Sequence, residues 1–487
     1  MADLLSVGKT GLFASKKSLE VTGHNLANVN TEGFSRQKVV QSTSIPNSTG
    51  GLITGTGVRV NEITRVNDPF LDKRFNLASS GSQYYETRSD HLNQIESIFN
   101  EIDNEGLNQI MNRFFNSFRE LANQPENETI RSVVRDNANM VVKDFKRIRE
   151  TLDMQANSID KKITTSVNEV NQILHHVADL NEKIQTVESN HGETGDLRDQ
   201  RDLALKNLSE YFKIHTYEDE KKRFVISAQG IGTLVSGLSV QELAVASMNK
   251  NQSSNNMSGS AEVILRDRPA QRISESFQSG KLSSLIKVRN TDLRKLQDDV
   301  DNIAFQFAQS VNAIHRQGYV NRPIEMGADG KPLPIDKRGP TTGINFFADP
   351  ISSDGYANSI DLSDEVKSDL TNVTTGLAPN SPGDNRVAIA ISKLQHEKIL
   401  GDGTTTLEEK FLQTIGNIGL ETGKARLDAE QSRGILAQAK TMRERLVGVS
   451  IDEETANMVR YQHAYEASAK VMAAADDMFK TIISLKR

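Results

Sequence analysis

A leucine recurs at every seventh position from Leu5 to Leu26, and this repeat constrains the fold more than any other feature of the sequence. Smaller residues occupy the positions three further along, so the repeat has a strong and a weak row: Leu5, Leu12, Leu19 and Leu26, with Gly8, Ser15 and Thr22. Two rows at this spacing predict a helix with a narrow apolar stripe, and such a stripe packs along another helix. The alternative is an ordinary amphipathic helix packed on its own domain.

The C-terminal segment carries a matching stripe. Its positions alternate in steps of three and four along one helical face: Met458, Tyr461, Tyr465, Ser468, Met472, Ala475, Phe479 and Ile482. Three carboxylates, Asp452, Glu453 and Glu454, precede the stripe, where negative charge suits the positive end of the helix dipole. We therefore predict that both ends of the chain are helices that pair with each other and with neighbouring copies, which makes the stripe positions candidate self-assembly residues.

The composition limits the chemistry that the chain can perform. There is no cysteine, so disulfides, thiolate metal sites and cysteine nucleophiles are excluded. The formal net charge is −6 and no basic stretch has interleaved aromatic residues, so we expect no nucleic-acid partner. No run approaches the roughly 18 apolar residues of a membrane span, and the N-terminus does not resemble a cleavable signal peptide, so we expect no membrane insertion. Export would then need a route without a cleaved signal.

No set of residues has the spacing of a catalytic, cofactor or metal site. His175 and His176 are adjacent, and neighbours on a helix point in different directions, so they are poor joint ligands. Gly55 and Gly57 lack the third glycine and the following helix of a phosphate loop, so a β-turn is the better interpretation. We predict a protein without enzymatic activity, cofactor or metal.

Between the two ends, the composition predicts helix, β, helix, a mixed insertion and helix again. Short β-like runs are expected over residues 42–66, extended helices over 68–210 and β structure over 213–268 with an exposed loop at 249–260. Helix is expected again over 281–315 and from 387 to the end, with a break near Gly401 and Gly403. The expected fold class is therefore mainly α with β insertions, in a multidomain chain whose inner layer is formed from both halves of the sequence.

Residues 23–37 resemble the N-terminal signature of flagellar axial proteins, which rod, hook and hook-associated proteins share. Its characteristic positions here are Ala27, Asn28, Asn30, Thr31, Gly33, Arg36 and Gln37. Asparagine and glycine at such positions end a helix and turn the chain.

Further segments resemble the hook-associated branch of this family. The element D-L-R-D-Q-R-D at residues 196–202 contains Asp199, Gln200, Arg201 and Asp202, and the C-terminal entry contains Asp452, Glu453 and Glu454. Other similar blocks lie at 55–58, at Arg65, at 68–71, at 280–312 and at 382–385. The similarity runs from about residue 4 to residue 485 and is weakest in the middle insertion.

The resemblance implies an elongated axial protein in layers. Residues 1–42 and 448–487 would form a terminal coiled-coil assembly domain that is disordered in the monomer. Residues 43–320 and 385–447 would form a helical-bundle rod domain with a β-rich segment near 213–268, and residues 321–384 a small mixed or β insertion in the outer unit.

The resemblance also implies a function and partners. We expect a structural subunit that forms a homo-oligomeric ring on the hook and joins it to the filament. It would contact the hook protein and the next hook-associated protein (hook-associated protein 3). It would reach the hook by flagellar type III export, and a dedicated chaperone would bind its C-terminal helix before export. The alternatives are a hook or distal rod subunit of the same family, or an enzyme on an axial framework. Residues 318–384 are the segment where such an enzyme would lie, and they contain neither the histidine nor the cysteine that metal-protease or thiol chemistry would need.

Overall fold

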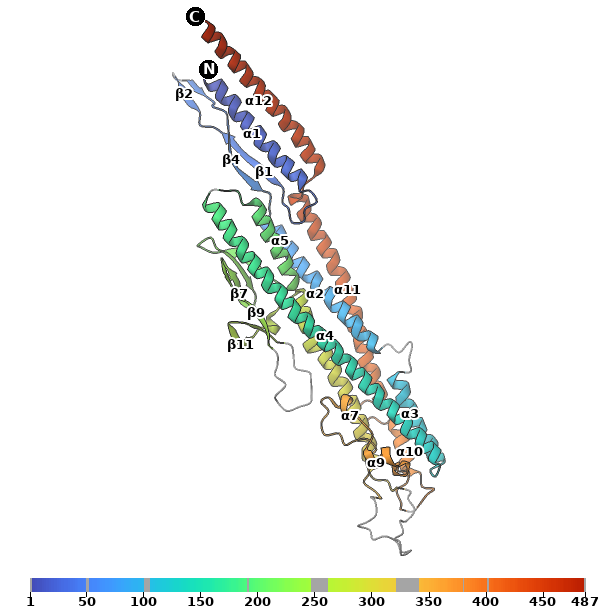
Figure 1. The fold of residues 1–487 in the computed structure, drawn as a ribbon. Helices are drawn as coiled ribbons and strands as arrows, with labels where there is room; N and C mark the ends of the chain where they lie inside the picture. Colours follow the sequence, from blue (N-terminus) through green and yellow to red (C-terminus); the bar gives the residue numbers. More distant parts are fainter. Residues whose placement is uncertain are drawn as a thin grey trace.

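The fold is an elongated rod in which the two ends of the chain lie together at one tip (Figure 1). It was obtained as a computed structural model, which describes residues 2–49, 52–99, 106–190, 192–246, 262–320, 341–379, 381–400 and 403–485. The predicted class is confirmed, because helices dominate and the sheets are small and antiparallel.

The narrow tip is a pair of antiparallel helices, α1 (Ala2–Ala27) and α12 (Ile451–Leu485). Their backbones approach closely where Gly8 faces Met472, since a Cβ on Gly8 would lie 2.8 Å from Met472 Cγ and 3.3 Å from its backbone nitrogen. A long hairpin covers α1. It consists of β1 (Gln37–Thr43), β2 (Asn47–Thr49), β3 (Leu52–Thr54) and β4 (Val58–Arg65), with β1 paired to β4 and β2 to β3.

Two long antiparallel helices, α2 (Pro69–Phe99) and α11 (Leu407–Val447), form one side of the wider part of the rod. Ion pairs join them at several levels, such as Arg443 to Asp72 at 2.7 Å and Arg426 to Glu96 at 2.9 Å. A capping box between Thr406 and Glu409 begins α11, and Gly448 ends it just before α12.

The long helix α4 (Glu128–Ser189) runs beside this pair and lies in the region 68–210, where extended helices were predicted. Its first free amides are capped by Asn127, whose side chain accepts from the backbone N–H groups of Thr129 and Ile130. The remaining bundle elements are α3 (Leu107–Asn123), α5 (Gly195–Tyr211), α6 (Gly280–Lys287), the π-helical turn η2 (Val288–Leu293), α7 (Arg294–His315), α10 (Arg386–Lys393) and the turn η5 (Leu394–His396).

A β unit packs against α4 where β structure was predicted. It contains a four-stranded sheet, β5 (His215–Glu218), β6 (Phe224–Ala228), β7 (Gly232–Ser236) and β8 (Ser239–Val240), and a three-stranded sheet, β9 (Leu243–Ala246), β10 (Glu262–Leu265) and β11 (Arg268–Arg272), followed by the turn η1 (Ser274–Ser276). The sheets bury Ile226, Val235 and Val263 in the main core. The loop predicted at 249–260 lies outside the described residues.

The described part of the predicted insertion packs into the far end of the rod. It includes the short helices α8 (Tyr356–Ser359) and α9 (Asp364–Ser368) and the turn η4 (Leu370–Asn372). Phe346 and Phe347 are fully buried against Phe114 of α3 and Phe307 of α7, so residues 341–379 share the core of the bundle. Residues 321–340 lie outside the description, and the division of the chain into domains stays a prediction.

Candidate functional site

A cluster of polar contacts joins the narrow tip to the wider rod, and we call it the polar joint. It is built by Asn25, Ser35, Arg36, Gln37, Arg65, Asp196, Asp199, Asp202, Glu453 and Glu454. These residues come from the end of α1, the following loop, the start of β1 and the end of β4, which pair with each other, and the starts of α5 and α12. Residues 23–37, 196–202 and 452–454, three of the sequence blocks that resemble axial proteins, therefore meet at one place.

Asn25 is the innermost member of the polar joint. Its side-chain amide donates to the Gln37 carbonyl at 2.9 Å and accepts from the Gln37 backbone N–H at 2.9 Å, which fixes the chain where it leaves α1 and enters β1. The same amide donates to Glu454 Oε2 at 3.2 Å. Asn25 and Glu454 are both buried, so this contact fastens α1 to the start of α12 away from water.

Arg36 connects the tip to the rod on the other side of Glu454. Its guanidinium lies 2.6 Å from the Glu454 carboxylate and 2.8 Å from that of Glu453. Its backbone N–H donates to the Val447 carbonyl at the end of α11, and its carbonyl accepts from the Val66 N–H after β4. One residue thus holds four segments of the chain together.

The D-Q-R-D element contributes through its two aspartates. Asp199 accepts from the Ser35 backbone N–H at 2.9 Å and from Arg65 at 2.9 Å, and Arg65 also pairs with Asp202 at 2.5 Å. Burial raises the pKa of Asp199, although the hydrogen bonds from Ser35 and Arg65 oppose this shift. Gln200 is exposed and makes no part of the polar joint.

Arg201 points in another direction, toward the β unit. Its guanidinium carbon lies 3.9 Å from the centre of the Phe224 ring, and it donates to the side-chain oxygen of Asn181 at 3.2 Å. Burial lowers the pKa of this arginine. The element therefore fastens α5 to the tip through its aspartates and to the β unit through its arginine.

The turn after α1 uses the small and amide residues of the signature. Asn28 donates to the His24 carbonyl at 3.0 Å, and Thr31 donates to the side-chain oxygen of Asn28 at 3.1 Å. Gly33 has a φ of +84°, and a Cβ there would lie 3.2 Å from Leu203, so both conformation and space favour glycine. Ala27 and Asn30 are exposed.

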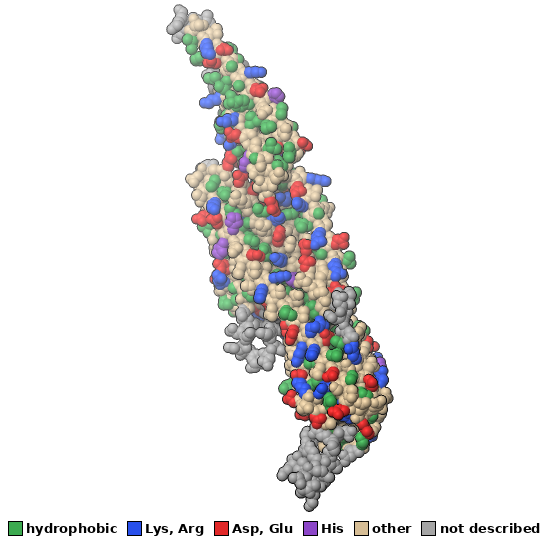
Figure 2. All heavy atoms as spheres, turned by 45° about the vertical axis from the view of Figure 1, so that its right-hand side comes forward, with side chains coloured by type: hydrophobic (Ala, Val, Ile, Leu, Met, Phe, Trp, Pro, Cys, Tyr) green, Lys and Arg blue, Asp and Glu red, His purple; other side chains and the backbone are tan. Residues whose placement is uncertain are grey.

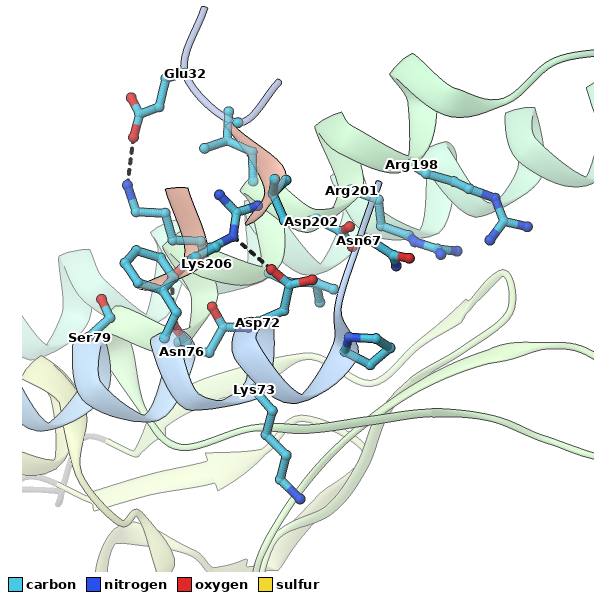
Figure 3. Close-up of a pocket in the computed structure, with 18 of the residues that line it drawn as sticks. Glu32, Asn67, Asp72, Lys73, Asn76, Ser79, Arg198, Arg201, Asp202 and Lys206 are labelled. Atoms are coloured by element: carbon cyan, nitrogen blue, oxygen red, sulfur yellow. Dashed lines mark hydrogen bonds and ion pairs between the residues drawn. The ribbon is translucent and has the colours of Figure 1, made fainter. Parts of the chain in front are cut away.

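A cleft of about 1090 Å³ lies beside the polar joint (Figure 3). It is lined by the loop 28–34, the first turns of α2, one face of α5 and the end of α11. Two ion pairs within the chain lie in it: Lys206 with Glu32 at 2.5 Å, and Arg443 with Asp72 at 2.7 Å. Among the described residues no group of three histidines, aspartates or glutamates could hold a metal ion. The described residues that line the cleft offer no set of convergent reactive groups.

The predicted stripe of α1 divides into two different environments. The weak row faces α12, because Gly8, Ser15 and Thr22 are buried and Gly11, in the same small-residue face, would place a Cβ 2.8 Å from Ser468 Oγ. The leucines are half-buried at positions 12, 19 and 26, and Leu5 is exposed. The leucine row is thus only partly covered within one chain.

The C-terminal stripe is covered near the polar joint and open toward the tip. Met458, Tyr461 and Met472 are half-buried and Ala475 is buried, whereas Tyr465, Phe479 and Ile482 are exposed. The two stripes therefore meet where small residues of α1 face α12, and they leave Leu5, Tyr465, Phe479 and Ile482 exposed.

Sequence reasoning missed four members of the polar joint as site residues: Asn25, Ser35, Arg65 and Asp196. Asn25 and Ser35 lie inside the signature segment, and Arg65 and Asp196 lie in other blocks that resemble the family. Only the contacts show that these scattered positions belong to one cluster.

Comparison with known proteins agrees with this architecture. The family description "Flagellar hook-associated protein FlgK helical domain" matches residues 92–331, and "Flagellar basal body rod FlgEFG protein C-terminal" matches residues 446–485, which include Glu454. Flagellar hook-associated protein 1 of Bacillus subtilis is 29% identical over 99% of this chain and 97% of its own length. The chain belongs to the flagellar hook-associated protein 1 family. The protein of that name from Salmonella typhimurium is 22% identical, with both chains covered completely.

A solved structure of this family has the same fold. The flagellar hook junction protein FlgK from Burkholderia pseudomallei superposes with a TM-score of 0.62 at 14% identity, over 78% of this chain and all of that one. No helix among the described residues is long and apolar enough to cross a membrane.

Proposed function

We propose that this hook-associated protein is a structural subunit of the bacterial flagellum that self-assembles at the distal end of the hook and joins hook to filament. The observation that carries the proposal is the polar joint, where the three sequence blocks typical of axial proteins fasten both chain ends into one tip. Family membership supports the same role.

The tip is the part of the chain suited to contacts between copies. Hydrophobic side chains spread over the narrow end formed by α1 and α12 (Figure 2). Phe479 is 59% exposed, and Leu5 and Ile482 are also exposed. Neighbouring copies in a ring would cover these side chains, which a single chain leaves in water.

The polar joint has a different role in this proposal. It contains no reactive constellation, and its hydrogen bonds and ion pairs connect α1, α5, α11 and α12 within one chain. Such a cluster sets the direction of the tip relative to the rod. A ring of copies needs this direction to be the same in every copy.

The partners follow from the junction role. We infer that the chain contacts the hook protein on one side and hook-associated protein 3 on the other, and that it leaves the cell by flagellar type III export. The exposed apolar residues at the end of α12 would be covered by a dedicated export chaperone before assembly. We infer no catalytic activity, since no convergent reactive set is found among the described residues; turnover abolished by one polar substitution would overturn this inference.

A clean deletion strain tests the function. We expect non-motile cells that carry hooks without filaments and release filament subunits into the medium, visible by electron microscopy and by analysis of the culture supernatant. The wild-type gene supplied in trans should restore filaments. Normal filaments in the deletion strain would contradict the proposal.

A further inference from the structure

The outward face of α11 carries an apolar seam that no other part of the described chain covers. The seam consists of Gly416, Leu420, Gly423 and Leu427, spaced by four, three and four residues. Leu420 is 74% exposed and Leu427 is 68% exposed. Ile418 and Ala425, which are buried in the bundle, lie two residues away and so about 200° around the helix. The seam therefore points directly away from the rod.

The glycines of the α11 seam have no explanation inside the chain. Glycine in a helix interior costs stability relative to alanine. A Cβ added to Gly416 or Gly423 would meet nothing within 4 Å among the described residues. On α1, by contrast, two of the three helical glycines, Gly8 and Gly11, face α12 at close range. Glycine on the outward face of α11 is consistent with an equally close helix from another chain.

The spacing and the surroundings of the seam also suit a helix. Steps of three and four residues keep a seam in line along a partner helix. Exposed uncharged residues, Gln413, Asn417 and Gln431, border it, together with two cations, Lys424 and Arg426, and one anion, Glu430. Arg426 is already paired with Glu96 of α2. A surface with balanced charge does not select a strongly charged partner.

The chain itself presents a second row that could lie against this seam. On α4, Val133, Met140 and Met154 are exposed and separated by multiples of seven residues. In Figure 1, α4 lies toward the viewer and α11 behind it. A closed ring needs two different faces on each copy, because the contact is head-to-tail. Flexible methionine side chains adapt to the grooves beside glycines.

We propose that the α11 seam binds a second copy of this chain, through the exposed row of α4 on that copy. The inference rests on the proposed ring assembly and adds a contact between rod domains to the contacts at the tip. The proposed contact is continuous with the tip, because α11 leads through Gly448 directly into α12, the helix that we propose for assembly. Copies that pack side by side through α12 would bring their rod domains together as well.

Photo-crosslinking in assembled flagella tests the identity of the occupant. Irradiation of the variant Leu420→p-benzoylphenylalanine should give a crosslinked product of twice the chain's mass. Mass spectrometry of this product should identify a peptide of α11 joined to a peptide of α4 from this protein. The same substitution at Leu238, an exposed leucine in the β unit, should give no such product. No product at position 420, or a product with the hook protein or any other protein, would overturn the inference.

Complementation of the deletion strain gives a second measurement. We expect the double variant L420E/L427E to reduce the swimming zone to that of the deletion strain, while its monomer melts within about 1 °C of the wild type because both sites are exposed. The matched control L238E should swim like the wild type. If L420E/L427E also swims like the wild type, the seam is not a contact, although the proposed function stands. If the wild-type gene fails to restore swimming, the proposed function itself is wrong.

Discussion

The Arg36 guanidinium lies 2.6 Å from the carboxylate of Glu454, although 418 residues separate the two in the sequence. Glu454 is only 2% exposed, and Asn25 donates to its other oxygen. Glu453 also pairs with Arg36, but its side chain is 63% exposed. The two adjacent glutamates therefore differ in burial while sharing one partner.

This difference predicts unequal effects of removing either charge. Glu454→Gln should destabilise the polar joint by about 2 kcal/mol, because the half-buried guanidinium of Arg36 loses the charge of its buried partner. Glu453→Gln should cost less than about 0.5 kcal/mol, as exposed ion pairs do. Native-state hydrogen exchange of residues 21–37 measures the local opening. Equal protection in the two variants would show that Glu454 does not hold the joint.

Limited proteolysis of the dilute monomer locates the boundary of stable structure. The sequence predicted mobile ends before about Ser42 and after about Gly448. Asn25 and Glu454 lie in these two terminal segments, but both are buried and hydrogen-bonded to each other in the polar joint. We therefore expect a stable fragment that still contains both residues, with trimming restricted to the outer turns of α1 and α12. Mass spectrometry of the fragment gives its ends. A fragment that lacks both residues would mean that the joint forms only on assembly.

Leu12→Asp should separate assembly from monomer stability. Leu12 is half-buried on the partly covered leucine row of α1, so the monomer should melt within a few degrees of the wild type. In a ring, the added charge would be buried against a neighbouring copy, and motility should be lost. The measurements are the melting temperature of the monomer and the diameter of the swimming zone. A large fall in the melting temperature would place Leu12 in a preformed core.

Two glycines of α1 form a matched pair for testing the contact with α12. Gly8→Val should cost about 1–3 kcal/mol of tip pairing, since even its Cβ would lie 3.3 Å from the backbone nitrogen of Met472. Gly23→Ala should be neutral or stabilising by about 0.5–1 kcal/mol, because a Cβ there meets nothing within 4 Å. Incorporation into isolated hook–filament particles should fall only for Gly8→Val. Normal incorporation of that variant would contradict the close approach.

His315 predicts a loss of stability in acid. It is fully buried, its Nδ1 donates to the Ile344 carbonyl at 2.8 Å and its Nε2 accepts from the Thr374 N–H at 3.0 Å. Burial lowers the pKa of His315 from 6.5 to about 4, so the unfolded chain binds the proton more readily between these values. Stability contributed by the neutral ring is present above pH 6.5 and is lost as the pH falls toward 4.

Between pH 7 and pH 5 this histidine should cost about 2 kcal/mol of the free energy of unfolding. His315→Gln should start less stable at pH 7, because the amide cannot reproduce both hydrogen bonds, but it should lose less on acidification. His463→Gln, at an exposed ring, should keep the wild-type slope. Denaturant unfolding at the two pH values compares the variants. An unchanged slope in His315→Gln would show that another group causes the acid sensitivity.

The sequence alone determined the helical class, the extended helices within 68–210, the β segment near 213–268 and the paired stripes at the two ends. These features depend on local periodicity and on turn and capping residues, which act between neighbours a few positions apart. The helix α4 and the strands of the β unit lie where that periodicity predicted them.

Tertiary structure alone decided which row of each stripe is used within the chain. Both rows of α1 fit a helical seam, and only close packing against α12 selects the row with glycine and serine, since leucines there would hold the backbones apart. Likewise, Asp199 and Arg201 are two positions apart in one motif, yet the turn of α5 sends one to the tip and the other to the β unit. The polar joint itself connects Asn25 to Glu454 across 429 positions, and sequence spacing carries no information about contacts at that range.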